Sequence, residues 1–551
     1  MLLAIALTIG VIFATNVIFP PQKTVTKAVT DSAATTSPAV PAPATASALP
    51  SGAVLAGAPP PASAGLTAGD TVQVRSARAT MAFTSVGGAP LKVTLHEFKS
   101  LPGKTAEAAL VSPAGALLRY AVVTNGDTVR FDRTLFAATT ATGTGQTTVT
   151  YRATEKGITL TARYRVDTTE TDAYLTRAQV TVDGAGTPAF LRIGMPMGFV
   201  SQETKPEEDA THLAYAFKPE KRSADIIAFG KLDPGERRIE AGPFSWVVAK
   251  SKYFMVGLLV DSTRSPIIEL QVTGQPRTAK LATAGTAELI VDLARGPLSF
   301  ELYGGPQEWV RLHQLGRDFE NANPYGGWLQ GAVQPFATIV MRLLLWMKSK
   351  TGFSYGWLLV VFAVGIRLML WPLNQTAMRS SLKMQRIQPE LAQVQERFKG
   401  DPAKLQQEMM KVYGEHGMSP FSAFSGCLPM LIPLPILFAL FFVFQNTIEF
   451  RGVSFLWLPD ISLGDPLYIM PLSMGASMFL LSWIGMKNAP ANPQAKMMSW
   501  LLPGMMTFMF LNFASGLTLY YFVQNLAALP QQWLIANERS KRATEAVPAR
   551  R

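Results

Sequence analysis

The apolar residues of this chain follow two different patterns. Between Asp70 and Glu320 they alternate with polar residues, whereas from Gly331 onward they form long, nearly uninterrupted runs. Alternation with a period of two is typical of strands with one buried face. Apolar runs near 20 residues are long enough to cross a bilayer as a helix. The pattern therefore predicts a β domain followed by a helical membrane domain.

Three segments show the alternation most clearly. The predicted inward positions are Val149, Tyr151 and Ala153, then Ile158, Leu160, Ala162, Tyr164 and Val166, and a third alternating segment runs from Tyr174 to Val182. Glu155-Lys156-Gly157 separates the first two segments and is typical of a hairpin turn. Many short strands of this kind predict an all-β domain built as a large antiparallel sandwich.

The beginning of the chain is a separate apolar segment. Leu2 to Phe19 is uncharged and nearly long enough to cross a hydrocarbon core of ~30 Å, so we predict a transmembrane helix in residues 1–20. A cleaved signal peptide is the alternative, but Asn16 to Pro20 offers no small-residue cleavage site. Residues 21–68 are mostly alanine, proline, serine and threonine. Such a segment buries too little apolar surface to offset its ordering entropy, which predicts a flexible tether.

The second half contains five apolar segments that approach the length of a transmembrane helix. They are residues 355–373, 428–445, 468–486, 497–513 and 517–535. A helix within 323–352 precedes them and is predicted to lie in the membrane interface, because its apolar residues share one face and basic residues interrupt it elsewhere. That face comprises Val333, Phe336, Val340, Leu343, Leu344 and Met347. A short spanning helix is the alternative for this segment.

Basic residues gather in alternate loops between these segments. They are frequent between the first and second segments, flank the loop between the third and fourth, and follow the last. The loop between the second and third carries only Arg451 against three acidic residues. Because lysine and arginine collect in cytoplasmic loops, this pattern places the β domain outside the cytoplasm and the C-terminus inside. The net charge of +12 then reflects topology and does not indicate a nucleic-acid partner.

Arg367 lies well inside the first of the five segments. Burying an arginine in lipid costs at least ~2.5–3.5 kcal/mol, so we expect Arg367 to face a hydrated cavity or a polar partner. Snorkelling to the interface is the alternative. The other four segments contain no acidic residue, and Tyr521, Gln524 and Asn525 on the last one are the candidate polar neighbours. An arginine without a fixed counter-ion is suited to receive an acidic group from a ligand.

Residues 380–417 contain two stretches with heptad-like spacing. The first seam is Met384, Ile387, Leu391, Val394 and Phe398, and the second is Leu405, Met409 and Val412. Gly400-Asp401-Pro402 between them supplies a helix stop, an N-cap and a first-turn proline. The spacing predicts a two-helix hairpin that projects into the cytoplasm, and a mere spacer is the alternative.

Several kinds of site are excluded. Cys427 is the single cysteine, so the chain forms neither an internal disulfide nor a thiolate metal cluster, and its four histidines lack metal-ligand spacing. The sequence contains no G-x-x-x-x-G-K-[ST], H-E-x-x-H or G-x-S-x-G motif, and no pair of intramembrane acids. We therefore predict a protein that is not an enzyme and that carries no cofactor or metal.

A series of short motifs also occurs in a fixed order. They are Trp246 through Lys250-Ser251-Lys252-Tyr253-Phe254, Arg367 with Trp371-Pro372-Leu373, Gln388-Pro389-Glu390, Glu408 to Tyr413, Gly426-Cys427-Leu428-Pro429, and Ser515 to Tyr521. In these motifs the chain resembles the YidC family of membrane protein insertases. The extra first span and the large β domain resemble the Gram-negative form. The resemblance implies five helices around a hydrophilic groove that opens to the cytoplasm and the lipid but is closed toward the periplasm.

These observations predict the following organisation. It comprises an N-terminal transmembrane helix (1–20), a tether (21–68), a periplasmic β-sandwich (69–322), an interfacial amphipathic helix (323–352), a five-helix core with the hairpin 380–417 (353–537), and a basic cytoplasmic tail (538–551). The fold class is thus an all-β sandwich joined to a helical bundle in the bacterial inner membrane.

The predicted function is insertion and folding of membrane proteins through a groove formed by Arg367, Tyr521, Gln524 and Asn525. The resemblance implies nascent membrane proteins, the lipid bilayer and the Sec translocon as partners, with the ribosome and targeting factors bound by the hairpin and tail. A secondary transporter with a periplasmic sensor domain is the alternative, although no repeated helices are detectable. A membrane-anchored sugar-active enzyme is a weaker one, resting on fold analogy alone.

Overall fold

The computed structural model describes residues 70–545 apart from twelve short gaps. The gaps are 103–104, 125, 170–173, 262–266, 278–280, 324–329, 373, 376–386, 388–389, 392, 417–433 and 487–492. The predicted N-terminal helix (1–20), the tether (21–68), most of the first hairpin helix and the end of the tail (546–551) therefore lie outside the described residues.

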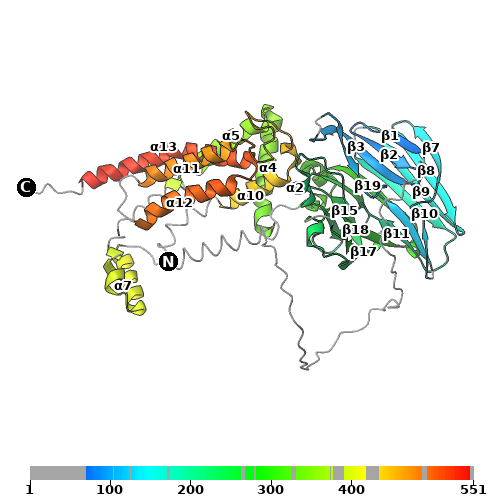
Figure 1. Cartoon of the computed structure of the whole chain (residues 1–551), viewed down its shortest axis with the longest axis horizontal. Helices are drawn as coiled ribbons and strands as arrows, with labels where there is room; N and C mark the ends of the chain where they lie inside the picture. Colours follow the sequence, from blue (N-terminus) through cyan, green and yellow to red (C-terminus); the bar gives the residue numbers. More distant parts are fainter. Residues whose placement is uncertain are drawn as a thin grey trace, which may run out of the picture. The chain divides into compact units, whose positions relative to one another are not determined.

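The β domain consists of three antiparallel sheets (Figure 1). The four-stranded sheet has the order β1 (Thr71–Arg75), β2 (Ala79–Thr84), β3 (Ala89–Lys99), β4 (Glu107–Val111). The nine-stranded sheet has the order β13 (Asp225–Ala228), β12 (Ala214–Pro219), β15 (Phe244–Lys250), β16 (Phe254–Leu259), β19 (Leu298–Pro306), β10 (Leu175–Asp183), β9 (Ile158–Asp167), β8 (Gln146–Glu155), β7 (Ala137–Gly143). The six-stranded sheet has the order β14 (Arg237–Ala241), β17 (Ile267–Gly274), β18 (Gly285–Asp292), β11 (Ala189–Gly194), β5 (Arg119–Thr124), β6 (Asp127–Arg130).

The predicted alternation is confirmed in β8 and β9. Every predicted inward residue of these strands is buried, from Val149 to Val166, and the polar residues between them are exposed or half-buried. Lys156 and Gly157 adopt positive φ angles of 49° and 80°, which forms the predicted tight turn. Two short helices that the sequence did not predict, α2 (Pro206–Ala210) and α3 (Trp309–Gln314), lie in the connections.

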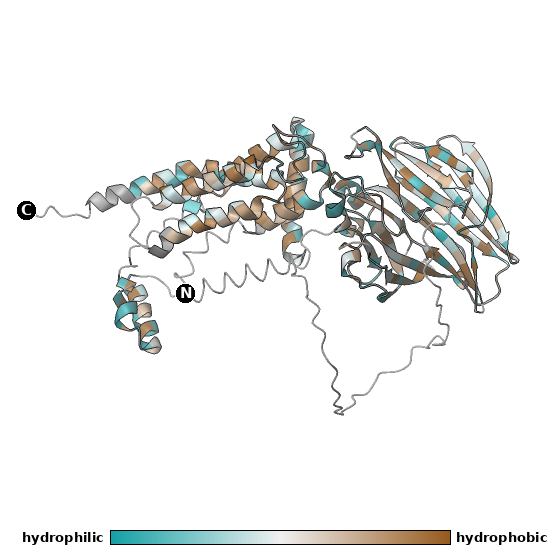
Figure 2. Ribbon diagram, viewed as in Figure 1, coloured by the Kyte–Doolittle hydropathy of each residue, from teal (hydrophilic) through white to brown (hydrophobic). Residues whose placement is uncertain are grey.

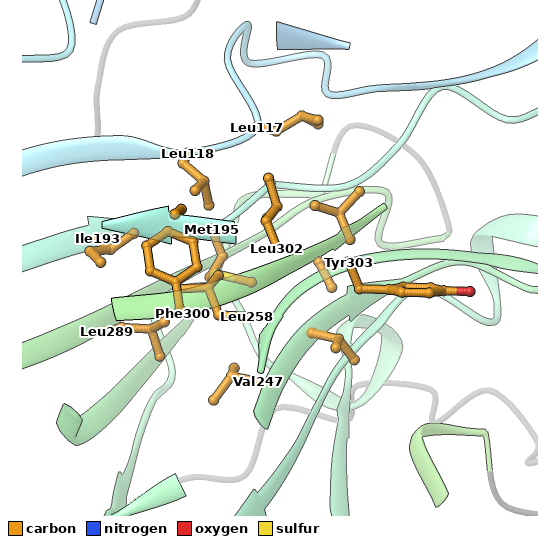
Figure 3. Close-up of a cluster of buried hydrophobic side chains, with 14 of the residues drawn as sticks. Leu117, Leu118, Ile193, Met195, Val247, Leu258, Leu289, Phe300, Leu302 and Tyr303 are labelled. Atoms are coloured by element: carbon orange, nitrogen blue, oxygen red, sulfur yellow. The ribbon is translucent and has the colours of Figure 1, made fainter. Parts of the chain in front are cut away.

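The core lies between the nine-stranded and six-stranded sheets. Figure 3 shows Phe300, Leu258 and Val247 from the larger sheet beside Ile193 and Leu289 from the smaller one. Each of these side chains is at most 4% exposed. Burying a large apolar side chain stabilises the fold by ~1.5–3 kcal/mol, so two facing apolar layers hold the sheets together. The predicted antiparallel β-sandwich is therefore confirmed.

The second part of the chain is helical. It contains α4 (Gln330–Thr351), α5 (Tyr355–Met369), α7 (Pro402–Glu415), α10 (Leu434–Asn446), α11 (Ile469–Met486), α12 (Pro493–Phe510) and α13 (Ser515–Glu545). Helix α13 packs against α5 and α11, α10 packs against α4, and α12 packs against α11. Figure 2 shows apolar residues along α5, α10 and α11, whereas α7 is largely hydrophilic.

Among the described residues, one helix, Ile469–Met486, is by itself long and apolar enough to cross a membrane. The pair Val333–Thr351 and Tyr355–Met369 passes the same test together but is bent by 119° at its break. Ile436–Asn446 and Met497–Phe510 are apolar but shorter. A helical C-terminal region is thus established, and its five transmembrane helices remain a prediction.

The predicted apolar face of helix α4 is covered only in part by the other described helices. Val333, Val340 and Leu344 are buried against the other helices, but Phe336 is 45% exposed and Leu343 is 36% exposed. The helix packs through a narrower stripe than its apolar spacing indicates, which leaves part of its apolar surface uncovered by the rest of the chain. The interfacial location of α4 stays a prediction.

The described part of the hairpin contains the predicted seam. Ile387 and Leu391 from the first stretch pack with Val412 and Tyr413 of α7 in a small separate cluster. The Asp401 side chain accepts a hydrogen bond of 3.2 Å from the backbone N–H of Lys404, as expected of an N-cap.

Candidate substrate groove

Helices α5, α11 and α13 enclose a hollow of about 420 Å³. Their apolar residues pack against each other, and polar side chains at the facing positions are left to line the space. The polar lining residues are Arg367, Asn374, Ser482, Tyr520, Tyr521, Gln524, Asn525 and Gln532. The structure therefore brings all four sequence-predicted groove residues, Arg367, Tyr521, Gln524 and Asn525, to one hollow.

Arg367 has a neutral partner that the sequence analysis missed. Its Nη2 donates a hydrogen bond of 2.9 Å to Oε1 of Gln531, which is fully buried on α13. The Gln531 amide in turn donates to the carbonyl of Trp371 at 3.2 Å and to Oε1 of Gln375 at 3.1 Å. Within the described part of the chain, Arg367 forms no ion pair. The guanidinium is thus held in place, and no described acidic residue pairs with its positive charge.

The sequence did contain a signal for Gln531. It lies seven positions after Gln524, and residues two helical turns apart share one face of a helix. Position 531 lay within the predicted last span, 517–535, but was not singled out as a polar neighbour of Arg367; the helix itself, α13, continues to Glu545.

Gln524 and Asn525 join helices as well as line the hollow. The Gln524 amide donates to the carbonyl of Ala363 on α5 at 2.8 Å and to the Tyr520 hydroxyl at 3.1 Å. The Asn525 amide donates to the Ser477 hydroxyl on α11 at 3.0 Å. Neither residue has a described hydrogen bond to Arg367, but both line the same hollow as Arg367.

Tyr521 contributes an aromatic wall. Its ring packs edge-on against Phe510 of α12, with centroids 5.3 Å apart, and against Tyr520 at 5.5 Å. Tyr520 is itself a lining residue that the sequence analysis did not single out. The hollow therefore combines one cation, several amides and two tyrosines with apolar walls.

The loop between α10 and α11 closes one end of this helix group. The Asp465 carboxylate accepts hydrogen bonds from the backbone N–H groups of Leu467 and Met470 at 2.9 and 2.7 Å. The N–H groups of Ser515 and Gly516, which begin α13, donate to loop carbonyls at 2.7 and 2.9 Å. A Cβ at Gly516 would lie 2.6 Å from the Phe444 ring, so only glycine permits this close approach.

The arrangement offers groups suited to binding. Among the described residues, no three histidine, cysteine, aspartate or glutamate side chains are grouped so as to hold a metal ion. The hollow contains no described carboxylate or histidine that could act as a general acid or base. It can attract an anionic group and offer amide and hydroxyl hydrogen bonds.

Two family models match the chain. The model described as "60Kd inner membrane protein" matches residues 346–542, and the model described as "YidC periplasmic domain" matches residues 71–339. The membrane protein insertase YidC of Chlorobaculum tepidum is 34% identical over 313 residues, which cover 53% of this chain and 51% of that protein. The YidC of Prosthecochloris aestuarii is 30% identical over 429 residues, which cover 73% of this chain and 70% of that protein. The chain thus spans about half the length of the first of these relatives.

Solved structures give weaker matches. A crystal structure of an active YidC insertase with its first transmembrane domain resolved aligns over 85% of this chain and 93% of its own, at 17% identity and a TM-score of 0.35. A galactose mutarotase-like protein from Lactobacillus casei aligns over 43% of this chain and 100% of its own, at 10% identity and a TM-score of 0.31. These TM-scores are too low to carry an argument.

Proposed function

Because the chain belongs to the YidC family of membrane protein insertases, we propose that it inserts and folds integral membrane proteins through the hollow beside Arg367. The observation that carries the proposal is the hydrogen bond from Arg367 to the neutral amide of Gln531. A partner of this kind orients the guanidinium without neutralising it. The cation is therefore available to an acidic group of a client protein.

The same geometry defines a mechanism. The polar tail of a client enters the hollow, where Arg367 attracts its carboxylates and the amides of Gln524 and Asn525 replace part of its hydration. Attraction between opposite charges strengthens as the effective dielectric falls, so a cation between apolar helices acts more strongly than one in water. The apolar segment of the client then leaves sideways along the helices into the lipid.

We place the protein in the bacterial inner membrane, with the β domain in the periplasm and the C-terminus in the cytoplasm. Large apolar side chains on the helices face outward, among them Trp357 at 54%, Leu368 at 62% and Phe508 at 77% exposure. An exposed apolar surface of this extent is costly in water and favourable in lipid. The alternation of basic loops supports the orientation.

The proposed partners are nascent membrane proteins, the lipid bilayer, the ribosome or targeting factors at the hairpin and tail, and the Sec translocon. No enzymatic step is proposed, and the matched relatives are named as insertases. A secondary transporter is less well supported, because one fixed arginine among amides offers no pair of titratable groups for ion coupling.

Reconstitution tests the proposal. Liposomes that contain only this protein should insert a small single-span client, so that protease added outside no longer degrades its translocated tail. Liposomes with the Arg367→Glu variant provide the matched control for an acidic tail. Equal protection in protein-free liposomes would rule out the proposed activity for that client.

A further inference from the structure

A tight turn in the loop between α10 and α11 presents two large apolar side chains to the outside. The backbone N–H groups of Phe455 and Leu458 each donate to the carbonyl of the other residue at 2.9 Å, which closes a two-residue hairpin around Leu456 and Trp457. Phe455 and Leu458 are buried, whereas Leu456 is 66% exposed and Trp457 is exposed as well. The base of the hairpin therefore belongs to the core, and its turn tip, Leu456 and Trp457, does not.

The backbone of Leu456 is unusual for a leucine. Its φ angle is 54°, at the first central position of the turn. Two-residue hairpins use a positive φ at this position and normally place glycine there. A bulky residue with positive φ is an outlier, and such residues persist where another requirement holds them. Leucine thus destabilises the turn while most of its side chain stays exposed, so folding alone does not explain its presence.

The turn is fixed at the ends of two apolar helices. The Asp465 carboxylate, which accepts hydrogen bonds from backbone N–H groups at the start of α11, also accepts one of 3.2 Å from the Trp457 indole. The Phe455 ring lies edge-on to Trp357 in the first turn of α5, with centroids 5.4 Å apart. A Cβ at Gly356 would collide with the same ring. The turn tip is therefore held at the N-terminal ends of α5 and α11.

We propose that the turn tip inserts into the surface of the lipid bilayer on the side of the β domain. Helix α11 is long and apolar enough to cross a membrane, so its end lies at a membrane surface. Arg451, in the same loop, pairs with Glu203 of the β domain, which identifies the side. A tryptophan with an apolar ring and a hydrogen-bonded indole N–H is typical of the boundary between lipid and water.

The composition of the turn favours lipid over a protein partner. Residues from Gly452 to Pro459 carry no charge, so the tip enters an apolar phase without burying an ion. Phe353 and Trp357 near the start of α5, and Leu467 before α11, are exposed apolar residues too. A specific protein interface uses ~20–30 residues on each side, whereas two side chains are enough to enter a lipid surface.

Insertion explains why leucine occupies a glycine position. A leucine side chain that leaves water for lipid gains the free energy of apolar transfer, which offsets the unfavourable backbone conformation. The loop then has two attachments, one to the β domain through Arg451 and one to the bilayer through the turn tip. The inference depends on the membrane location of the chain and is independent of client insertion.

The test locates a nitroxide on the turn tip in liposomes that contain the full chain. Cys427 is the single cysteine, so the label is attached to Leu456→Cys in a Cys427→Ala background. Oxygen concentrates in lipid and a nickel chelate stays in water. The label should therefore be readily accessible to oxygen, and its accessibility to nickel should be severalfold lower than in the control. The matched control is Leu135→Cys, because Leu135 is a leucine of the β domain with a similar exposed fraction, 69%.

A second measurement needs no label. Asparagine adopts the left-handed conformation more readily than leucine, so Leu456→Asn keeps the turn and replaces only the apolar side chain. Hydrogen exchange of residues 453–459 in liposomes should be severalfold faster in this variant than in the wild type. Exchange in α5 should stay the same, which would show that the base of the hairpin is still packed against that helix.

Three results would overturn the inference. Equal nickel accessibility of the labels at 456 and 135 would place the turn tip in water. A label at 456 that is shielded from both oxygen and nickel would place it against protein, and spin–spin broadening that disappears on dilution with unlabelled chains would identify a second copy. Equal hydrogen exchange of residues 453–459 in the wild type and Leu456→Asn would mean that the leucine does not hold the loop at the membrane.

Discussion

Arg451 and Glu203 form a buried ion pair between residues 248 positions apart in the chain. Arg451 Nε lies 2.8 and 3.0 Å from the two carboxylate oxygens, and the side chains are 3% and 9% exposed. The two terminal nitrogens of Arg451 donate to the carbonyls of Lys99 and Gln202, each at 2.9 Å. All three nitrogens of the guanidinium therefore donate to groups of the β domain and attach the loop between α10 and α11 to it.

We expect Arg451→Met to destabilise this attachment strongly. The change leaves the Glu203 carboxylate buried without its partner, and breaking a buried pair from one side costs ~3–5 kcal/mol. Chemical unfolding followed by tryptophan fluorescence in detergent measures the free energy of unfolding. The double variant Arg451→Met/Glu203→Leu should recover much of the loss, because both charges are removed. The single variants Arg451→Met and Glu203→Leu are measured as well. If the double variant loses as much unfolding free energy as the two single variants together, the ion pair is not the origin of the effect.

Lys250 predicts a pH dependence of stability. Its Nζ donates to the Ala322 carbonyl at 3.1 Å and to Oδ1 of Asn323 at 2.8 Å, and burial lowers the pKa of its amine to about 7. In the unfolded chain the pKa returns to its usual 10.5. Between these values the unfolded state binds more protons than the folded state, so the free energy of unfolding should rise as pH rises through this window and should be lowest below pH 7.

Lys250→Met isolates this effect. The variant should have an unfolding free energy lower by ~1–3 kcal/mol, because the buried acceptors on Ala322 and Asn323 lose their donor. Its unfolding free energy should, however, lack the dependence on pH that Lys250 contributes. The measurement is the difference between the two proteins in unfolding free energy at a series of pH values from 7 to 10. A difference that stays constant over that range would show that Lys250 is charged in the folded state.

The strands were predictable because their signal is local. In β8 and β9 the side-chain alternation alone identifies the buried face, and the turn at Lys156 and Gly157 follows from residue type. The polar surroundings of Arg367 in a hollow were also predictable, since an arginine in an apolar run requires a polar environment. In both cases a few neighbouring residues carry the information.

The contacts of these residues were not predictable in the same way. Gln531 meets Arg367 across 164 positions, and Arg451 meets Glu203 across 248, so only the packing of the helices and sheets brings them together. In α4, similarly, the spacing identifies the apolar residues but not which of them another helix covers. Tertiary contacts of this kind leave no periodic trace in the sequence.

The hairpin should be required for insertion even though it lies outside the predicted spans. Its two stretches pack through Ile387, Leu391, Val412 and Tyr413, which makes it a small folded unit and suits contact with a ribosome or an emerging client. Val412→Asp places a charge in this cluster and should reduce insertion several-fold without loss of the protein from the membrane. Lys411→Asp, one position away, is the control for charge alone. Full activity of a stable Val412→Asp variant would argue that the hairpin is only a spacer.

Gln531 should act as a positioning residue for Arg367. Gln531→Leu removes the only described hydrogen-bond acceptor of the guanidinium and should slow insertion of an acidic-tailed client about tenfold. Gln531→Glu is more informative, because it gives Arg367 a fixed counter-ion and should abolish the preference for acidic tails. Gln532→Leu changes a lining residue with no described hydrogen bond to Arg367, and it should have a smaller effect. Identical behaviour of the Leu and Glu variants would mean that Gln531 serves packing alone.

The last prediction concerns the charge of Arg367 itself. Its neutral partner and its hollow leave a cation in surroundings of low effective dielectric, where attraction to a carboxylate is stronger than in water. Clients with acidic translocated tails should therefore depend on it most. Arg367→Lys retains the charge but loses the planar fork, so much of the activity should survive.

Arg367→Ala should slow acidic-tailed clients sharply and leave neutral-tailed clients nearly unaffected, because a neutral tail needs only a hydrated cavity. Arg367→Glu should be worse than Ala for acidic tails, since it adds repulsion, and it should favour basic ones. The measurement is the insertion rate of one client carrying acidic, neutral or basic tails into liposomes with each variant. Equal losses for all three tails would mean that Arg367 hydrates or braces the groove, because a purely structural role cannot distinguish the sign of the charge that passes it.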